Sequence, residues 1–156
     1  MTKTELQHYL TSHIPLTRAL ALEVLEVSDA RVALKAPLAP NLNHRQTAFG
    51  GSVAAVAVLA GWGWLHGRLA GFSPGCRLVI QRQVVDYLLP IEAEFTAECA
   101  APAAGDWNRF ARTLDSRGRG RIDLKVSVIC RDELAARFEG AYVALAPDGE
   151  SRAESR

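Results

Sequence analysis

Residues 43–65 read Asn-His-Arg-Gln-Thr-Ala-Phe-Gly-Gly-Ser-Val-Ala-Ala-Val-Ala-Val-Leu-Ala-Gly-Trp-Gly-Trp-Leu, a polar loop that runs through two glycines into an apolar segment. The apolar segment has no polar face, so a helix formed there must be enclosed by other structure. The first N–H groups of such a helix, near Gly50, Gly51 and Ser52, have no partner within the helix and carry the positive end of its dipole. The start of this helix is therefore suited to a carbonyl oxygen or an anion.

The same segment raises the question of a membrane span. From Gly50 to Leu65 it is almost entirely apolar and contains four glycines, but it is shorter than the ~20 residues that cross a bilayer. We therefore predict a buried core helix over about residues 50–69, ending near Gly67 or Gly71, and no contact with a membrane.

The composition suits one domain, residues 1–146, followed by a polar tail, 147–156, that we predict to be disordered. The chain has 18 Lys and Arg against 17 Asp and Glu, so no global field attracts nucleic acid or an anionic membrane. The N-terminus lacks the apolar core of a signal peptide. The three cysteines, Cys76, Cys99 and Cys130, have no close C-x-x-C spacing, and we interpret them as reduced core residues. These features predict a cytoplasmic protein with no metal site.

The rest of the chain reads mainly as strands. A short helix is expected over residues 2–11, ahead of Pro15. Trp107, Phe110 and Leu114 recur at helical spacing and predict a second short helix over 106–116, with a strand as the alternative. Valine-rich or alternating runs predict strands at residues 22–27, 31–38, 77–87, 91–99, 122–128 and 134–145. Because strands and helices do not alternate along the chain, an antiparallel sheet wrapped around the apolar helix is favoured.

This order of elements resembles the hot-dog fold of acyl-CoA thioesterases and dehydratases, an α+β fold in which a curled antiparallel sheet encloses one long helix. In the phenylacetate-type thioesterases the loop before the helix reads Asn-x-x-Gly-x-x-His-Gly-Gly, and Asn43, Gly50 and Gly51 lie at the same spacing. Residues 40–43, 47–52 and 60–63 also resemble the thioesterase domain that follows an N-acetyltransferase domain in some bacterial proteins. The chain would be such a thioesterase domain standing alone.

The resemblance implies roles for individual residues. Asn43 would help to position a thioester, and the backbone N–H of Gly50 would polarise its carbonyl. A backbone donor placed where negative charge develops can lower a reaction barrier by about 3 kcal/mol. Four neighbouring residues are expected to contact the substrate or to shape its site: Thr47, Phe49, Gly51 and Ser52. Ser52 would cap the helix or donate a hydrogen bond rather than act as a nucleophile.

Two departures from the motif concern catalysis. Gln46 replaces the motif glycine and Phe49 replaces its histidine. In addition, residues 50–70 contain no Asp or Glu, although relatives commonly carry a carboxylate there that attacks the thioester or activates water. If water is the nucleophile, a proton acceptor is still required.

Two side chains are candidates for this base. Asp86 lies in the apolar run of residues 84–88, where an ionisable group is costly to bury without a partner or a function. In hot-dog dimers the corresponding strand lies near the subunit boundary, so the resemblance implies that Asp86 could approach the start of the partner subunit's helix. The alternative is that it faces solvent or pairs with Arg82. His44 has a pKa suited to neutral pH, but loop histidines are usually just solvated.

We therefore predict a hydrolase of acyl-CoA or acyl-carrier thioesters that needs no cofactor, since coenzyme A enters only as part of the substrate. The resemblance implies a homodimer or a dimer of dimers. The main alternative is a non-catalytic acyl-CoA-binding or regulatory domain, which the missing carboxylate favours. A dehydratase would need a second catalytic side chain near the loop, and the tract Arg117–Arg121 is too short to indicate RNA binding. Trp62 and Trp64 are interpreted as core residues rather than acyl-chain contacts.

Overall fold

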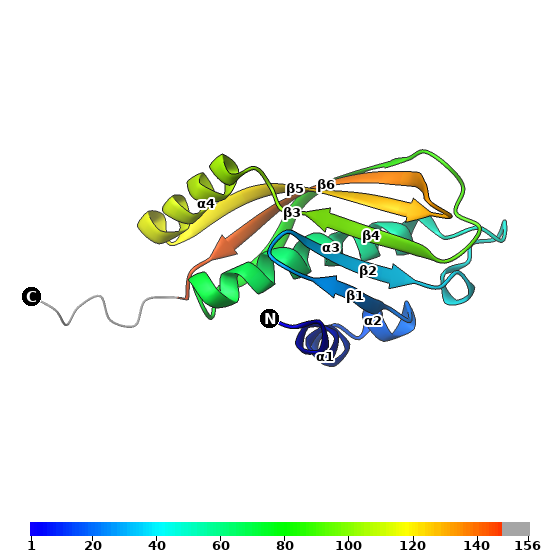
Figure 1. Ribbon diagram of the computed structural model, residues 1–156, viewed down its shortest axis with the longest axis horizontal. Coiled ribbons are helices and arrows are strands. Elements are labelled where there is room, and N and C mark those ends of the chain that lie inside the picture. Colours follow the sequence, from blue (N-terminus) through cyan, green and yellow to red (C-terminus); the bar gives the residue numbers. More distant parts are fainter. Residues whose placement is uncertain (148–156) are drawn as a thin grey trace, which may run out of the picture.

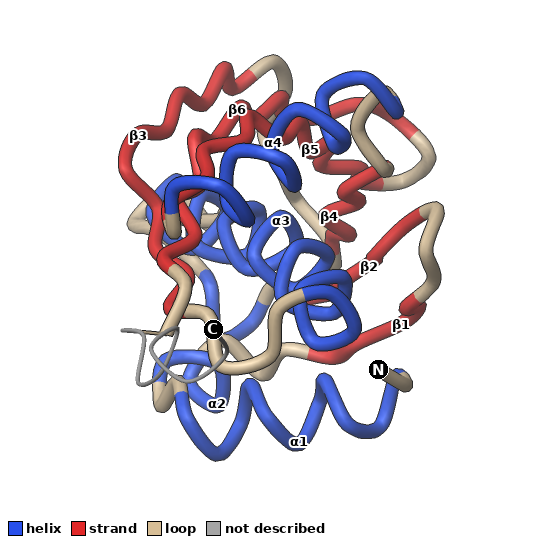
Figure 2. The backbone as a smooth tube through the Cα atoms, turned by 90° about the vertical axis from the view of Figure 1, so that its left-hand side faces the viewer, coloured by secondary structure: helices blue, strands red, loops and turns tan. Residues whose placement is uncertain are grey.

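The computed structural model describes residues 1–147, in which six strands form one sheet in the order β1-β2-β4-β5-β6-β3 (Figure 1). Every neighbouring pair is antiparallel. The strands are β1 Glu23–Val27, β2 Arg31–Ala36, β3 Arg77–Tyr87, β4 Phe95–Ala100, β5 Arg119–Cys130 and β6 Glu133–Leu145. The sheet curls around the helix α3 (Gly50–Phe72), so the predicted α+β hot-dog fold is confirmed (Figure 2).

The helix α3 ends at Phe72, one residue beyond Gly71, so of the two predicted ends Gly71 is right and Gly67 is wrong. The chain keeps its helical hydrogen bonds until Ser73 donates to the Leu69 carbonyl and Pro74 follows. With 23 residues it is long enough to cross a bilayer, so the length argument against a membrane span is wrong. The packing identifies it as a core helix, since Val56 and Ala60 are fully buried beneath the sheet.

Close approach between α3 and the sheet depends on a glycine. An alanine Cβ at Gly61 would overlap the hydroxyl of Tyr142 on β6 and lie 2.9 Å from its Cζ. Tyr142 is fully buried, and its hydroxyl donates to the Val58 carbonyl at 2.8 Å. Trp64 is also buried, as predicted, and its indole N–H donates to the Asp29 carbonyl at 3.1 Å. These contacts fix α3 against β6 and against the turn between β1 and β2.

Three other α-helices and one 3₁₀ helix complete the described part. The helix α1 (Lys3–His13) lies on the side of α3 that the sheet leaves open (Figure 2). The helix α4 (Ala104–Arg117) packs Phe110 and Leu114 against Gly120 of β5, so the helix interpretation is right and the strand alternative is wrong. The sequence did not predict α2 (Leu16–Ala19) or the 3₁₀ helix at Ala39–Asn41.

The predicted strands differ from the observed ones mainly at their ends. The strand β4 begins at Phe95 rather than Ile91, because the Ile91 carbonyl accepts a hydrogen bond from the Ala48 N–H at 2.8 Å and holds this segment against the loop before α3. The strand β2 ends at Ala36, directly before Pro37. Cys99 and Cys130 are buried and Cys76 is partly buried, all as free thiols. The predicted disordered tail lies, apart from Pro147, outside the described residues.

Stacked rings join α1 to α3. The Tyr9 ring stacks on His13 with centroids 4.2 Å apart, and the Trp62 ring stacks on His66 at 4.3 Å. Tyr9 also lies against both α3 rings. Partial burial, and secondarily the nearby His13, lower the pKa of His66 below its ordinary value. The neutral form of His66 is therefore the one that the folded protein favours.

We expect acid to destabilise the fold through His66. Because the pKa of His66 is lower in the folded protein, the unfolded chain takes up this proton first as the pH falls, and the free energy of unfolding decreases below about pH 6.5. His66→Phe keeps a ring in the stack but cannot titrate, so its melting temperature should fall less than that of the wild type between about pH 7 and 5. His8→Phe, at an exposed position on α1, is the control and should follow the wild type. Identical pH profiles for His66→Phe and the wild type would contradict this account.

Candidate active site

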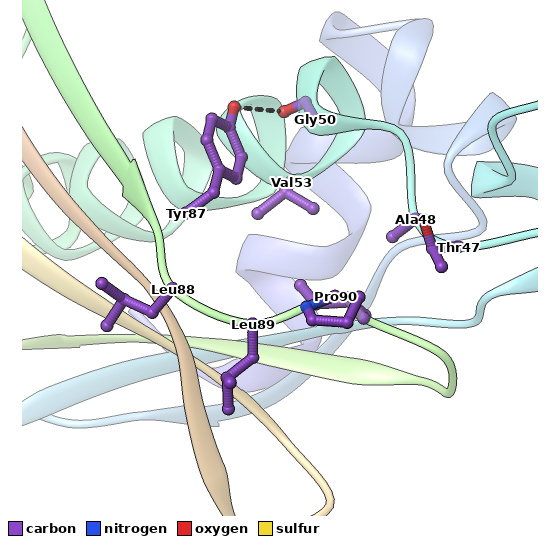
Figure 3. Close-up of a pocket in the computed structure, with 9 residues that line it drawn as sticks. Thr47, Ala48, Gly50, Val53, Tyr87, Leu88, Leu89 and Pro90 are labelled. Carbon is purple, nitrogen blue, oxygen red and sulfur yellow. Dashed lines mark hydrogen bonds between the residues drawn. The ribbon is translucent and has the colours of Figure 1, made fainter. Parts of the chain in front are cut away.

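The loop before α3 and the connection from β3 to β4 meet at the start of α3 and leave a cavity of about 410 Å³ (Figure 3). The loop is held in place by hydrogen bonds from the Phe49 N–H to the Asn41 carbonyl, at 2.7 Å, and from Ala48 to Ile91. The residues lining the cavity are Thr47, Ala48, Gly50, Val53, Tyr87, Leu88, Leu89, Pro90 and Ile91. None of these side chains carries a charge, so the cavity suits a neutral and mainly apolar group.

Backbone donors are free at the start of α3. The first hydrogen bond that closes a helical turn runs from the Val53 N–H to the Phe49 carbonyl at 3.1 Å. The N–H groups of Gly50, Gly51 and Ser52 come before it, and within residues 1–147 none of the three has an acceptor. The N-cap position is held by Phe49 rather than by Ser52, and no side chain caps the helix. These donors and the helix dipole favour an oxygen that carries negative charge.

Aromatic rings lie over both glycines. A Cβ at Gly51 would overlap the ring of Phe49, and a Cβ at Gly50 would lie 3.2 Å from the hydroxyl oxygen of Tyr87. The Tyr87 hydroxyl donates a hydrogen bond to the Gly50 carbonyl at 2.8 Å (Figure 3). Partial burial raises the pKa of Tyr87, which keeps the phenol protonated and able to donate. Tyr87 could not be recognised from the sequence, because this contact joins residues 37 positions apart.

Asn43 organises the loop. Its Oδ1 accepts hydrogen bonds from the backbone N–H groups of Arg45, at 2.7 Å, and Thr47, at 3.2 Å. Its Nδ2 donates to the Thr47 hydroxyl at 2.8 Å and more weakly to the Ala48 carbonyl at 3.4 Å. The side chain does not line the cavity. In this conformation Asn43 and Thr47 fix the shape of the loop that delivers the chain to Gly50.

Gln46 occupies a position with unusual backbone geometry. Its φ is 63°, in the left-handed region where a residue with a Cβ is strained and glycine is not. The motif that the loop resembles has a glycine at this place. A glycine would adopt this φ without strain, so the glycine of that motif would suit the turn that Gln46 makes here.

The two candidate bases lie away from the cavity. His44 is exposed near the tip of the loop and does not line the cavity. Asp86 is exposed on the outer face of the sheet, where it lines a separate hollow of about 360 Å³ with Lys125 and Arg137. Neither side chain lies beside Gly50 in this chain, and their predicted roles stay predictions.

A bulge in β3 explains the position of Asp86. Before the bulge, Leu78 and Ile80 pack against the core, so strict alternation would place even-numbered residues inside. The register shifts between Ile80 and Arg82, and beyond it Val85 is the residue that packs inward. One extra residue thus reverses which side chains face α3 and turns Asp86 outward.

Metal-binding side chains do not gather at this site. Across residues 1–147, no group of three His, Cys, Asp or Glu side chains is close enough to hold an ion. The chemistry that the described site offers is therefore that of backbone donors, the Tyr87 hydroxyl and an apolar wall.

The family described as "Putative thioesterase (yiiD_Cterm)" matches residues 3–146 of the chain. Among solved structures, a protein of unknown function from Chlorobaculum tepidum is similar with a TM-score of 0.87 and 27% identity, covering 93% of this chain and 94% of that one. A structure described as a "putative thioesterase" from Shewanella oneidensis has a TM-score of 0.78 and 28% identity, covering 93% and 97%. A "Probable Thioesterase" from Pseudomonas aeruginosa, with a TM-score of 0.78, 20% identity and 92% and 96% coverage, shares the fold.

Proposed function

Because this chain belongs to the YiiD_C family of hot-dog thioesterases, we propose that it hydrolyses an acyl thioester carried by coenzyme A or by an acyl-carrier protein. The observation that carries the proposal is the set of free N–H groups in the first turn of α3, at Gly50, Gly51 and Ser52, of which Gly50 lines a cavity without charged walls. A thioester has a carbonyl oxygen that can accept hydrogen bonds from these N–H groups and an acyl group that can pack against the apolar lining of the cavity. The neutral lining favours an uncharged acyl group.

The proposed reaction is attack by water. The oxygen of water adds to the thioester carbon, and the negative charge that forms on the carbonyl oxygen is stabilised by the N–H groups at the start of α3. The intermediate then collapses with cleavage of the bond from carbon to sulfur. The thiolate takes up a proton, and the products are a carboxylic acid and a free thiol. No step requires a cofactor, and we expect the reaction to occur in the cytoplasm.

His44 and Asp86 stay our candidates for the group that accepts the proton from water. The loop tip that carries His44 would have to move toward the cavity, and Asp86 would have to act from a second copy of the chain. The variants His44→Gln and Asp86→Asn separate the two, because only loss of the true base removes the acidic limb of the pH profile of kcat/KM.

A second copy of the chain fits the edge of the sheet. The strand β3 is at one end of the strand order and is 11 residues long. Val79, Val84 and Tyr87 on this strand are exposed, as are Leu88 and Leu89 after it. A long edge strand with exposed apolar side chains is a site for pairing with another strand. We propose a homodimer through β3, which would bring the second chain beside the cavity, because Tyr87 lines it.

A non-catalytic acyl-CoA-binding domain is the second candidate. The specific observation in its favour is that α3, from Gly50 to Phe72, has no Asp or Glu. The position of both candidate bases outside the cavity also supports it.

Release of free thiol distinguishes the two functions. We expect the purified protein to release coenzyme A from at least one member of a panel of straight-chain acyl-CoAs, with neutral acyl groups preferred over succinyl-CoA. A carrier-bound acyl group should be offered in parallel, to separate the two carriers. The assay should cover about pH 6 to 9, the range that includes the ordinary pKa values of histidine and cysteine side chains. Binding of these thioesters without turnover anywhere in this range would favour the binding domain.

A further inference from the structure

We propose that the Tyr87 hydroxyl is a positioning group that holds the Gly50–Gly51 peptide so that the Gly51 N–H points at the thioester carbonyl. The proposal rests on the proposed function, because it assigns a role within the same site. It concerns a residue that lies outside the loop motif and that no feature of the sequence indicated.

The geometry follows from the planarity of the peptide unit. The Tyr87 hydroxyl donates to the Gly50 carbonyl oxygen at 2.8 Å. That carbonyl and the Gly51 N–H belong to one trans peptide, so they point in opposite directions within one plane. Fixing the oxygen therefore fixes the direction of the N–H. Because Gly51 is in the first turn of α3, its N–H has no helical acceptor and is available to a ligand.

The hydrogen bond also strengthens the donor. A hydrogen bond accepted by a carbonyl polarises the amide and makes its N–H a better donor to the next group in the chain. Tyr87 lines the cavity, and its ring lies over Gly50. A larger residue at position 50 would crowd this ring. Gly50 therefore gives room for the close approach of Tyr87 as well as of a ligand, and a Cβ at this position would require a small shift of the tyrosine ring.

Tyr142 provides a matched comparison within the same helix. Its hydroxyl also donates to an α3 carbonyl, that of Val58, at 2.8 Å. It differs in being fully buried in the core and in not lining the cavity. Removal of the Tyr142 hydroxyl should therefore affect stability, whereas removal of the Tyr87 hydroxyl should affect the Gly51 N–H that donates to the thioester carbonyl.

The first test is kinetic. In Tyr87→Phe we expect kcat to fall about tenfold, because the weakened N–H donor matters most for the charged oxygen of the transition state, with a smaller rise in KM that follows the weaker binding of a carbonyl group. The melting temperature should change little, since phenylalanine keeps the ring and only the hydrogen bond to the Gly50 carbonyl is lost. In Tyr142→Phe we expect a lower melting temperature and an unchanged kcat. Equal losses of kcat in the two variants would overturn the proposal.

The second test does not depend on turnover. Calorimetry would compare two probes: a ketone analogue of hexanoyl-CoA, in which a methylene separates sulfur from the carbonyl, and S-heptyl-CoA, which has no carbonyl. Tyr87→Phe should weaken binding of the ketone by about three- to tenfold, the range expected for one hydrogen bond, and leave S-heptyl-CoA unaffected. If the wild type releases no thiol but this difference is found, hydrolysis fails and the positioning role stands. Equal effects on both probes, or no binding of either by the wild type, would overturn the role of Tyr87.

Discussion

Replacing Gly61 with alanine should lower the free energy of unfolding by about 2–4 kcal/mol, through overpacking and the loss of a buried hydrogen bond. The new methyl group would overlap the hydroxyl of Tyr142, which is fully buried. Tyr142 cannot move outward easily, since β6 is paired with β3 on one side and β5 on the other. Its hydroxyl would also lose the Val58 carbonyl. This loss exceeds the ~1 kcal/mol that alanine gains over glycine within a helix.

Gly71→Ala is the matched control for this effect. Gly71 lies in the same helix, is exposed, and has no atom within 4 Å of an added Cβ. This variant should be as stable as the wild type or more stable by up to about 1 kcal/mol. Urea denaturation of both variants measures the difference. If Gly61→Ala were as stable as Gly71→Ala, the close contact between α3 and β6 would be wrong.

The second large effect is expected on activity, at Gly50. We predict that kcat/KM of Gly50→Pro is about 100-fold lower than that of Gly50→Ala. This is the size of effect seen when one hydrogen-bond donor is removed from an oxyanion hole. Proline removes the N–H of residue 50, whereas alanine keeps it. Proline is tolerated at the first position of a helix, and Phe49, with φ −65° and ψ 128°, already has the extended backbone required before a proline.

Comparison with alanine, rather than with the wild type, isolates the donor. A Cβ at residue 50 approaches the Tyr87 hydroxyl to 3.2 Å in either variant, so both share whatever adjustment this contact causes. Melting curves would establish that both variants are folded. Equal activity of the two variants would mean that the Gly50 N–H does not bind the reacting carbonyl.

The sequence was sufficient to predict the arrangement of the main elements, for physical reasons. A segment as uniformly apolar as α3 is stable only when other structure surrounds it, and β5 alternates between buried and exposed residues along its whole length. The ends of elements were less predictable. Isoleucine is common in strands, but the Ile91 carbonyl accepts a hydrogen bond from the Ala48 N–H of the loop. The local sequence does not reveal this contact.

The site residues likewise differ in how far the local sequence could indicate them. The sequence could predict roles for Gly50, Gly51 and Asn43 because their spacing is local. Of the three, Gly50 lines the cavity, and Asn43 makes hydrogen bonds within the loop that the spacing did not indicate. The orientation of Asp86 could not be predicted by counting along the strand, because one bulge changes the parity. Tyr87 could not be found either, since its importance depends on a hydrogen bond to a distant carbonyl.

A crystal structure of the protein with the ketone analogue of hexanoyl-CoA tests the central claim most directly. We predict that the ketone oxygen lies within about 2.7–3.1 Å of the backbone nitrogen of Gly50 or Gly51, the range for a donor aimed at a developing oxyanion. The acyl chain should then lie against Val53 and the segment from Leu88 to Ile91. A ligand whose carbonyl faces solvent, or which binds away from the start of α3, would contradict the proposal that this helix terminus activates a thioester.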